Sequence, residues 1–266
     1  GRPKWLTRST KKGRLIIKYN AIKQRWYAHI ACFVSLKTKR EQRLIAAGVD
    51  LGRKIIAAAA TQHGRALLYR RGPLRADYYY FERKIAKLDR MIAKIEEVDK
   101  AVLRELRRRL FEKRRKRRDQ VFMNLAKHLA KELEKLGVNT VFVGYPRDIA
   151  HNKAGKENTN MWSYRQLIQR LVTTFENYGI AVFAVDEHLS SKICALHGCE
   201  VKREPRGLVR CPYGHTMHSD INAALNIMKR GLEALGVEAT SQRVRVESFV
   251  AAPDKVMPIA PRKKAG

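Results

Sequence analysis

The sequence predicts an α/β fold, in which a mixed sheet carries helices and a small metal-binding insert follows one of its strands. Strand-like segments come first, two long helical segments follow, and the chain then alternates strand, helix, strand and helix. Three of the four cysteines fall within the eighteen positions from Cys194 to Cys211, which indicates a metal site. With 266 residues, 45% of them apolar, the chain can bury a core in one large domain with such an insert.

The first strands are apolar runs separated by short turns. Asp50 ends the third of them, and His63-Gly64 forms the turn before the fifth. We therefore expect a three-stranded meander with an acid at the end of its first strand, preceded by two further strands. The five predicted strands are Arg14 to Tyr19, Trp26 to Val34, Leu44 to Val49, Ile55 to Thr61 and Arg65 to Tyr69.

Helical periodicity begins at Tyr78 and continues to Leu136, with a weak break around Val98 to Lys100, so two long helices are expected. The remaining segments are shorter and alternate in type. They are the strand Thr140 to Val143, the helix Trp162 to Tyr178, the strand Ile180 to Val185 and the helix Asp220 to Leu235. This order is typical of an RNase H-like mixed sheet. Three prolines and a basic end predict disorder after Val237.

The charge of the chain indicates a polyanionic partner. Lys and Arg number 56 against 25 Asp and Glu, which gives a net charge of +31. The longest apolar run, Ile55 to Ala60, is too short to span a bilayer, so we expect nucleic acid and no membrane. Gly1 to Lys12 is basic and polar, unlike a signal peptide, and the expected location is cytoplasmic and nucleoid-associated.

Three carboxylates stand where sheet strands end or where a helix begins. Asp50 follows the first strand of the meander, Glu187 follows the strand Ile180 to Val185, and Asp220 opens the last helix. Parallel strands deliver their carboxyl ends to one edge of a sheet, so these acids can meet there and hold two Mg²⁺ ions about 4 Å apart. We expect Asp50, Glu187 and Asp220 to bind catalytic Mg²⁺, which Mn²⁺ can replace.

The cysteine segment contains two knuckles with the spacing of a zinc site. Cys194 and His197 form the first, and Cys211 and His215 form the second, thirteen residues later. These four residues predict a tetrahedral Cys₂His₂ site for structural zinc, because four protein ligands leave no open position for catalysis. Cys199 is the alternative to His197.

Four motifs follow one another along the chain: Val49-Asp50-Leu51-Gly52, Ser190-Ser191-Lys192-Ile193-Cys194, Cys211-Pro212-Tyr213-Gly214-His215 and Ser219-Asp220-Ile221-Asn222-Ala223-Ala224-Leu225-Asn226-Ile227. In this order they resemble the TnpB (OrfB) proteins, relatives of the type V CRISPR effectors whose RuvC-like nuclease domain is split by a zinc ribbon. The resemblance implies a transposon-associated, RNA-guided DNA endonuclease that works with guide RNA and target DNA. It assigns the first and third catalytic carboxylates to Asp50 and Asp220.

One position departs from the family pattern. The family usually carries its second acid at the end of the strand that corresponds to Thr140 to Val143, where this chain has Gly144-Tyr145-Pro146. Some relatives carry the acid on the next strand, where this chain has Asp186 and Glu187; Glu187 has the longer reach. The alternative function is a nuclease-dead protein or regulator that only binds RNA and DNA.

The resemblance also divides the chain. Residues 1–43 are expected to be the end of a β-rich recognition region, and residues 44–190 and 219–236 the two parts of the nuclease domain, with the ribbon at 191–218 and a disordered tail at 237–266. In the predicted helix, ten of the fifteen residues from Arg104 to Arg118 are basic, and we expect it to contact the guide–target heteroduplex or the guide RNA. The assigned contacts are Arg107, Arg108, Lys113, Arg114, Arg115, Arg117 and Arg118.

Overall fold

The structure is a computed structural model that describes residues 12–21, 24–32, 43–52, 54–96, 100–145, 163–187, 190–205, 207–239 and 244–260. It divides into two compact units, residues 1–38 and 39–266. The first unit contains an antiparallel hairpin of β1 (Lys12–Asn20) and β2 (Arg25–Cys32). Val34, the last residue of the predicted second strand, and Trp162, the first residue of a predicted helix, lie outside the described residues.

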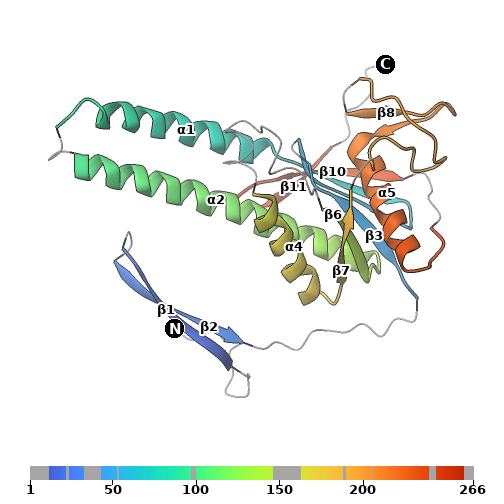
Figure 1. Ribbon diagram of the computed structural model, residues 1–266, viewed down its shortest axis with the longest axis horizontal. Helices are drawn as coiled ribbons and strands as arrows, with labels where there is room; N and C mark the ends of the chain where they lie inside the picture. Colours follow the sequence, from blue (N-terminus) through green and yellow to red (C-terminus); the bar gives the residue numbers. More distant parts are fainter. Residues whose placement is uncertain are drawn as a thin grey trace. The chain divides into compact units, whose positions relative to one another are not determined.

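The second unit is built on a seven-stranded mixed sheet with the order β11-β10-β5-β4-β3-β6-β7 (Figure 1). Its centre is the predicted meander of β3 (Ala46–Asp50), β4 (Ile55–Thr61) and β5 (Arg65–Arg70), whose strands pair antiparallel. The next strands, β6 (Thr140–Tyr145) and β7 (Ala181–Asp186), run parallel to β3. The predicted mixed α/β sheet is therefore confirmed.

The prediction of disorder after Val237 is wrong for most of that segment. β10 (Arg245–Ala251) pairs parallel with β5, and β11 (Val256–Ile259) forms the edge of the sheet beside it. Phe249 is 7% exposed and stacks on Tyr69 with ring centroids 5.3 Å apart. The prolines and basic residues counted in the sequence did not reveal that alternate residues of this segment could cover the end of the core.

Helices cover both faces of the sheet, because successive residues of each buried strand point to opposite sides. One face packs against α1 (Gly72–Ile92), α2 (Lys100–Lys135) and α4 (Tyr164–Asn177), with core residues such as Leu125 and Leu171. The other face packs against α5 (Ser219–Ala234). The ribbon hairpin of β8 (Leu208–Arg210) and β9 (Thr216–His218) leads directly into α5. Within the described residues, no helix has the length and apolar character needed to cross a membrane.

The contact between α5 and β3 depends on glycine. A Cβ atom added at Gly48 would overlap the backbone oxygen of Ala224 and would lie 2.7 Å from the backbone nitrogen of Met228. Gly231 of α5 makes a similar approach to the ring of Phe142 on β6. The helix therefore lies with its backbone almost on the sheet, which fixes the position of its first turn.

We expect Gly48→Ala to destabilise the protein by about 3 kcal/mol, the upper end of the usual cost of overpacking, because the atoms in its way belong to the backbone. Gly72→Ala is the matched control, since no atom lies within 4 Å of a Cβ at that position. Denaturant unfolding of both variants measures the difference. Equal stability of the two variants would contradict the close packing of α5 on β3.

Candidate functional site

Two of the three parallel strands β3, β6 and β7 carry or precede a predicted acid at their carboxyl ends. Asp50 is the last residue of β3, and its neighbour Val49 pairs with Val143 of β6. β7 pairs with β6 in turn and ends at Asp186, one residue before Glu187. Asp50, Gly144 and Glu187 therefore lie along one edge of the sheet, as the strand order predicts.

Glu187 occupies the space beside the position where the family pattern places its second acid. A Cβ atom added at Gly144 would lie 3.1 Å from Oε2 and 3.3 Å from Cβ of Glu187. It would also lie 2.6 Å from Cδ1 of Ile227 on α5, so the end of that side chain would have to move to make room. The absence of a side chain at Gly144 thus leaves room for the carboxyl group that arrives from the neighbouring strand.

Asp220 reaches the same edge from the first turn of α5. Its Oδ1 accepts a hydrogen bond from Oγ of Ser219 at 3.1 Å, and its backbone N–H donates to Nδ1 of His218 at 3.2 Å. Oδ2 of Asp220 lies 3.8 Å from where a Cβ of Gly52 would be, so the carboxyl group faces the turn that follows Asp50. The helix N-terminus is also a favourable position for a negative charge.

The other two carboxyl groups act electrostatically on Asp50. Burial raises the pKa of Asp50 well above its usual value; the charges of Asp220 and Glu187 raise it further, and Arg203 opposes them. Burial, with a smaller contribution from Asp186, raises the pKa of Glu187 to about 7. Buried carboxylates that repel one another favour a bound cation.

Glu187 has an unsatisfied atom of the kind that a cation would complete. Its Oε2 is buried and accepts no hydrogen bond from the part of the chain that the structure describes. An all-oxygen donor set of this kind suits Mg²⁺ or Mn²⁺. Among the described residues, however, the ligand atoms of one compact Cys/His set in the ribbon lie closer together than these carboxylate oxygens do.

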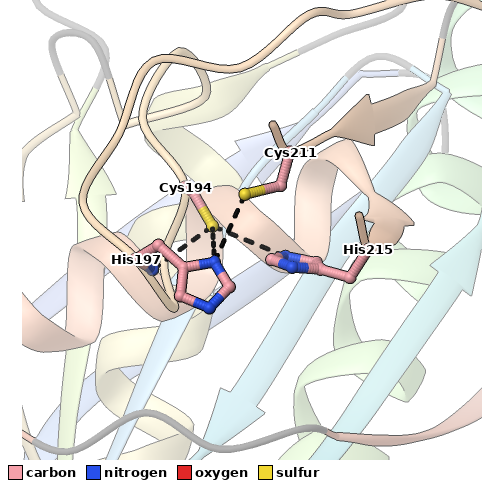
Figure 2. Close-up of side chains that lie close together, drawn as sticks. All are labelled: Cys194, His197, Cys211 and His215. Carbon is pink, nitrogen blue, oxygen red and sulfur yellow. Dashed lines mark hydrogen bonds between the residues drawn. The ribbon is translucent and has the colours of Figure 1, made fainter. Parts of the chain in front are cut away.

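That compact set is the predicted Cys/His cluster (Figure 2): the ligand atoms of Cys194, His197, Cys211 and His215 all lie within 4.8 Å of one another. Sγ of Cys194 lies 3.4 Å from Nε2 of His215, and Nδ1 of His197 lies 3.3 Å from Sγ of Cys211. Zinc bonds of 2.0–2.3 Å in a tetrahedron separate ligand atoms by about 3.3–3.8 Å. The cluster could therefore hold a zinc ion.

Cys199 stays close to this cluster without joining the compact set. Its Sγ lies 3.5 Å from Sγ of Cys211, and its backbone oxygen accepts a hydrogen bond from the backbone N–H of Cys194 at 2.7 Å. The backbone N–H groups of Leu196 and His197 each lie 3.4 Å from Sγ of Cys194, an arrangement that stabilises a thiolate. The compact set contains His197 and not Cys199, which favours His197 as the fourth ligand.

The basic helix is neutralised in part by the chain itself. Nε of Arg107 lies 2.5 Å from Oδ1 of Asp89, and Nε of Arg117 lies 2.7 Å from Oδ2 of Asp77, both on α1. Three more of the seven predicted nucleic-acid contacts form ion pairs, Arg108 with Glu105, Arg114 with Glu82 and Arg118 with Asp119. Much of the positive charge on this helix is therefore paired within the chain.

Two of the predicted contacts remain available. Lys113 and Arg115 are exposed, and neither forms an ion pair with any residue that the structure describes. Arg118 instead connects helices, because its Nη2 donates to Oε1 of Gln166 on α4 at 2.6 Å.

Two residues near the carboxylate edge were not among the predicted site residues. His218 precedes α5, and its Nδ1 caps the helix at Asp220. Arg203 acts on the pKa of Asp50 from the ribbon and donates to Oγ of Ser191 at 3.2 Å. A histidine just before a helix start is a visible capping signal, whereas the sequence gives no indication that Arg203 acts on Asp50.

Sequence comparisons extend over most of the chain. The family model described as "Probable transposase" matches residues 29–150, and the model described as "Cas12f1-like, TNB domain" matches residues 164–227. The TnpB-like protein ORF457 of Acidianus two-tailed virus is 36% identical over 281 residues, which cover 97% of this chain and 60% of that protein. The chain therefore spans about three-fifths of the length of this curated relative.

Solved structures share the fold. A Cas12f1-sgRNA-target DNA complex matches with a TM-score of 0.53 and 17% identity, over 85% of this chain and 68% of that chain. A CRISPR-Cas12f ternary complex matches with a TM-score of 0.54 and 20% identity, over 82% and 44% of the two chains. The mixed sheet, with helices on both faces and a ribbon before its last helix, has an RNase H-like, RuvC-type fold with a potential zinc site. Within that class, the sequence matches show that the chain belongs to the TnpB family.

We expect one equivalent of zinc per chain, because two thiolates and two imidazoles prefer zinc while the carboxylates prefer harder ions. Elemental analysis of the purified protein measures it. Cys211→Ser should lose the metal, since that thiolate is one of the four clustered ligand groups.

Cys199→Ser is the matched control, the same substitution at a thiol next to the compact set, and it should retain zinc. Loss of zinc in both variants would place Cys199 among the ligands and remove His197 from them.

Proposed function

We propose that this chain is the nuclease part of a transposon-associated, RNA-guided DNA endonuclease that hydrolyses phosphodiesters with Mg²⁺. The observation that carries the proposal is the position of Glu187, whose carboxyl group lies over Gly144 and acts on the pKa of Asp50 together with Asp220. Glu187, which follows β7, would thus replace the acid that the family pattern places at Gly144 of β6. Family membership and the charge of the chain support the same activity.

Asp50, Glu187 and Asp220 would hold the divalent cation, because they supply oxygen ligands at one edge of the sheet and no described residue donates a hydrogen bond to Oε2 of Glu187. A cation bound there supplies Lewis-acid stabilisation of the scissile phosphate and acidifies water. The protein contributes fixed negative charge that is costly without the cation. His218 holds the first turn of α5, and with it Asp220, in place by capping.

Guide RNA and target DNA are the proposed partners. The structural neighbour Cas12f1 is bound to sgRNA and target DNA, and this chain carries a net charge of +31. The exposed cations Lys113 and Arg115 are the proposed phosphate contacts on α2, and the ion-paired arginines fix that helix to α1. A nucleoid-associated location would follow from such binding.

The proposal can be tested by DNA cleavage. The protein is purified with the RNA that it retains, the RNA is sequenced, and plasmids with complementary inserts are incubated with the complex in Mg²⁺ or Mn²⁺. We expect cleavage by the wild type and a loss of at least about 100-fold in Asp50→Asn, Glu187→Gln and Asp220→Asn, with RNA and DNA binding retained. The amides keep the shape but lose the charge that binds the cation.

Asp186→Asn is the control for Glu187→Gln, because it removes a charge one residue away on a side chain that points to the opposite face of the strand. It should cleave as the wild type does. Loss of cleavage in Asp186→Asn with retention in Glu187→Gln would move the role to Asp186. A guide-loaded wild type that binds its target without cutting it would identify a nuclease-dead binding protein or regulator.

The role of α2 has a separate test. Lys113→Gln with Arg115→Gln should reduce the slope of log affinity against log salt by about 1.4 to 1.8, since each phosphate contact contributes about 0.7 to 0.9. The probe is an RNA–DNA heteroduplex of about 20 base pairs, measured by fluorescence anisotropy. Arg114→Gln with Arg117→Gln should leave the slope unchanged and lower the melting temperature instead, because these arginines pair with α1. If the wild type and the Lys113, Arg115 variant show the same slope of log affinity against log salt, this face of α2 is exposed to solvent and does not contact nucleic acid.

A further inference from the structure

Two asparagines lie side by side on the buried face of α5. Asn222 is 1% exposed and Asn226 is 8% exposed, and their spacing of four residues places them on one side of the helix. Amide side chains are rarely so buried unless each polar atom has a partner. The hydrogen-bond partners of Asn222 and Asn226 show which part of the chain the two side chains fix in place.

Both asparagines bind the backbone that leads into the first zinc knuckle. Oδ1 of Asn222 accepts a hydrogen bond from the backbone N–H of Ala195 at 2.9 Å, and its Nδ2 donates to the backbone oxygen of Ile193 at 2.7 Å. Nδ2 of Asn226 donates to the backbone oxygens of Ile193 and Ser190, each at 2.7 Å. The residues on both sides of Cys194 are therefore fixed to α5.

The same bonds reach the carboxylate edge. Ser190 is 4% exposed, and its backbone N–H donates to the backbone oxygen of Glu187 at 3.0 Å. Asn222 stands two residues after Asp220 on the same helix. One connected set of hydrogen bonds thus joins the cysteine ligand at Cys194, the backbone of Glu187 and the helix turn that carries Asp220.

We propose that Asn222 and Asn226 are positioning residues that couple the ribbon's metal site to the carboxylate edge. A zinc ion in the Cys/His cluster fixes the segment from Ile193 to Ala195. The asparagines and Ser190 transmit this order to Glu187, so that the carboxylate edge binds divalent cation best when the ribbon is loaded. The part that concerns cation binding rests on the proposed function; the coupling between ribbon and backbone does not.

The alternative is that the amides only satisfy buried backbone groups and stabilise the fold. The two roles differ in what a substitution changes. A stabilising role would lower the melting temperature alone, whereas a positioning role would change the cation affinity of a site that the asparagines do not touch.

Asn124 provides the matched control. Its Nδ2 donates to the backbone oxygens of Ala252 and Pro253, each at 3.1 Å, so Asn124→Ala removes an amide that bridges two carbonyls in another part of the same unit. It should lower stability without affecting either metal site.

The experiment measures Mn²⁺ binding by electron paramagnetic resonance and backbone hydrogen exchange of residues 187–196 by mass spectrometry. Wild-type protein is compared zinc-loaded and after zinc has been removed with a chelator that is then separated from the protein. We expect zinc removal to accelerate exchange in this segment and to weaken Mn²⁺ binding by about 10-fold. Asn222→Ala and Asn226→Ala should produce both changes in zinc-loaded protein, and Asn124→Ala neither.

Each outcome decides one question. The positioning role would be overturned if both zinc-loaded asparagine variants showed the Mn²⁺ affinity and hydrogen exchange of the wild type. It would also be overturned if zinc removal from the wild type left hydrogen exchange of residues 187–196 unchanged, a test that needs no substitution. The proposed function would be overturned instead if wild-type protein showed no Mn²⁺ binding that the Asp50→Asn substitution removes. In that case the exchange measurement still decides the coupling.

Discussion

The close approach of α5 to β3 at Gly48 is the constraint on which the arrangement of the site depends. Because glycine lets the two backbones come into contact, the first turn of α5 is fixed against the end of the strand that carries Asp50. A larger residue would push the helix outward and move Asp220 away from that edge. The same contact places Ile227 over Gly144, so α5 also determines which side chains fit beside Asp50.

This packing imposes an electrostatic cost. Burial raises the pKa of Asp50 and Glu187, and the charges of Asp220 and Glu187 raise the pKa of Asp50 further, so the unliganded protein does not favour full ionisation of the site. The fold holds the carboxyl groups in position by backbone structure and by bonds such as the His218 cap, while Oε2 of Glu187 accepts no hydrogen bond from the residues that the structure describes. A site that stores repulsion in this way is suited to bind a cation.

The basic helix shows how net charge and local charge differ. The chain carries +31 overall, yet much of the arginine on α2 is used to fix that helix to α1 and α4, as Arg117 and Arg118 show. Arginine suits this use because its planar fork can bind a carboxylate with two hydrogen bonds, as Arg117 does with Asp77. The surface that can contact a polyanion is therefore smaller than the charge run in the sequence suggests.

The sequence by itself determined the mixed sheet and the members of the Cys/His cluster, because strand periodicity and knuckle spacing are local properties of the chain. It also named Glu187 as a candidate for the missing acid, but only the tertiary structure decided that its carboxyl group lies over Gly144, because that requires the register between β6 and β7. The strands β10 and β11, the ion pairs of α2 and the bonds of Asn222 were decided by tertiary structure too. Each joins residues far apart in the chain, and their partners cannot be identified from periodicity, composition or spacing.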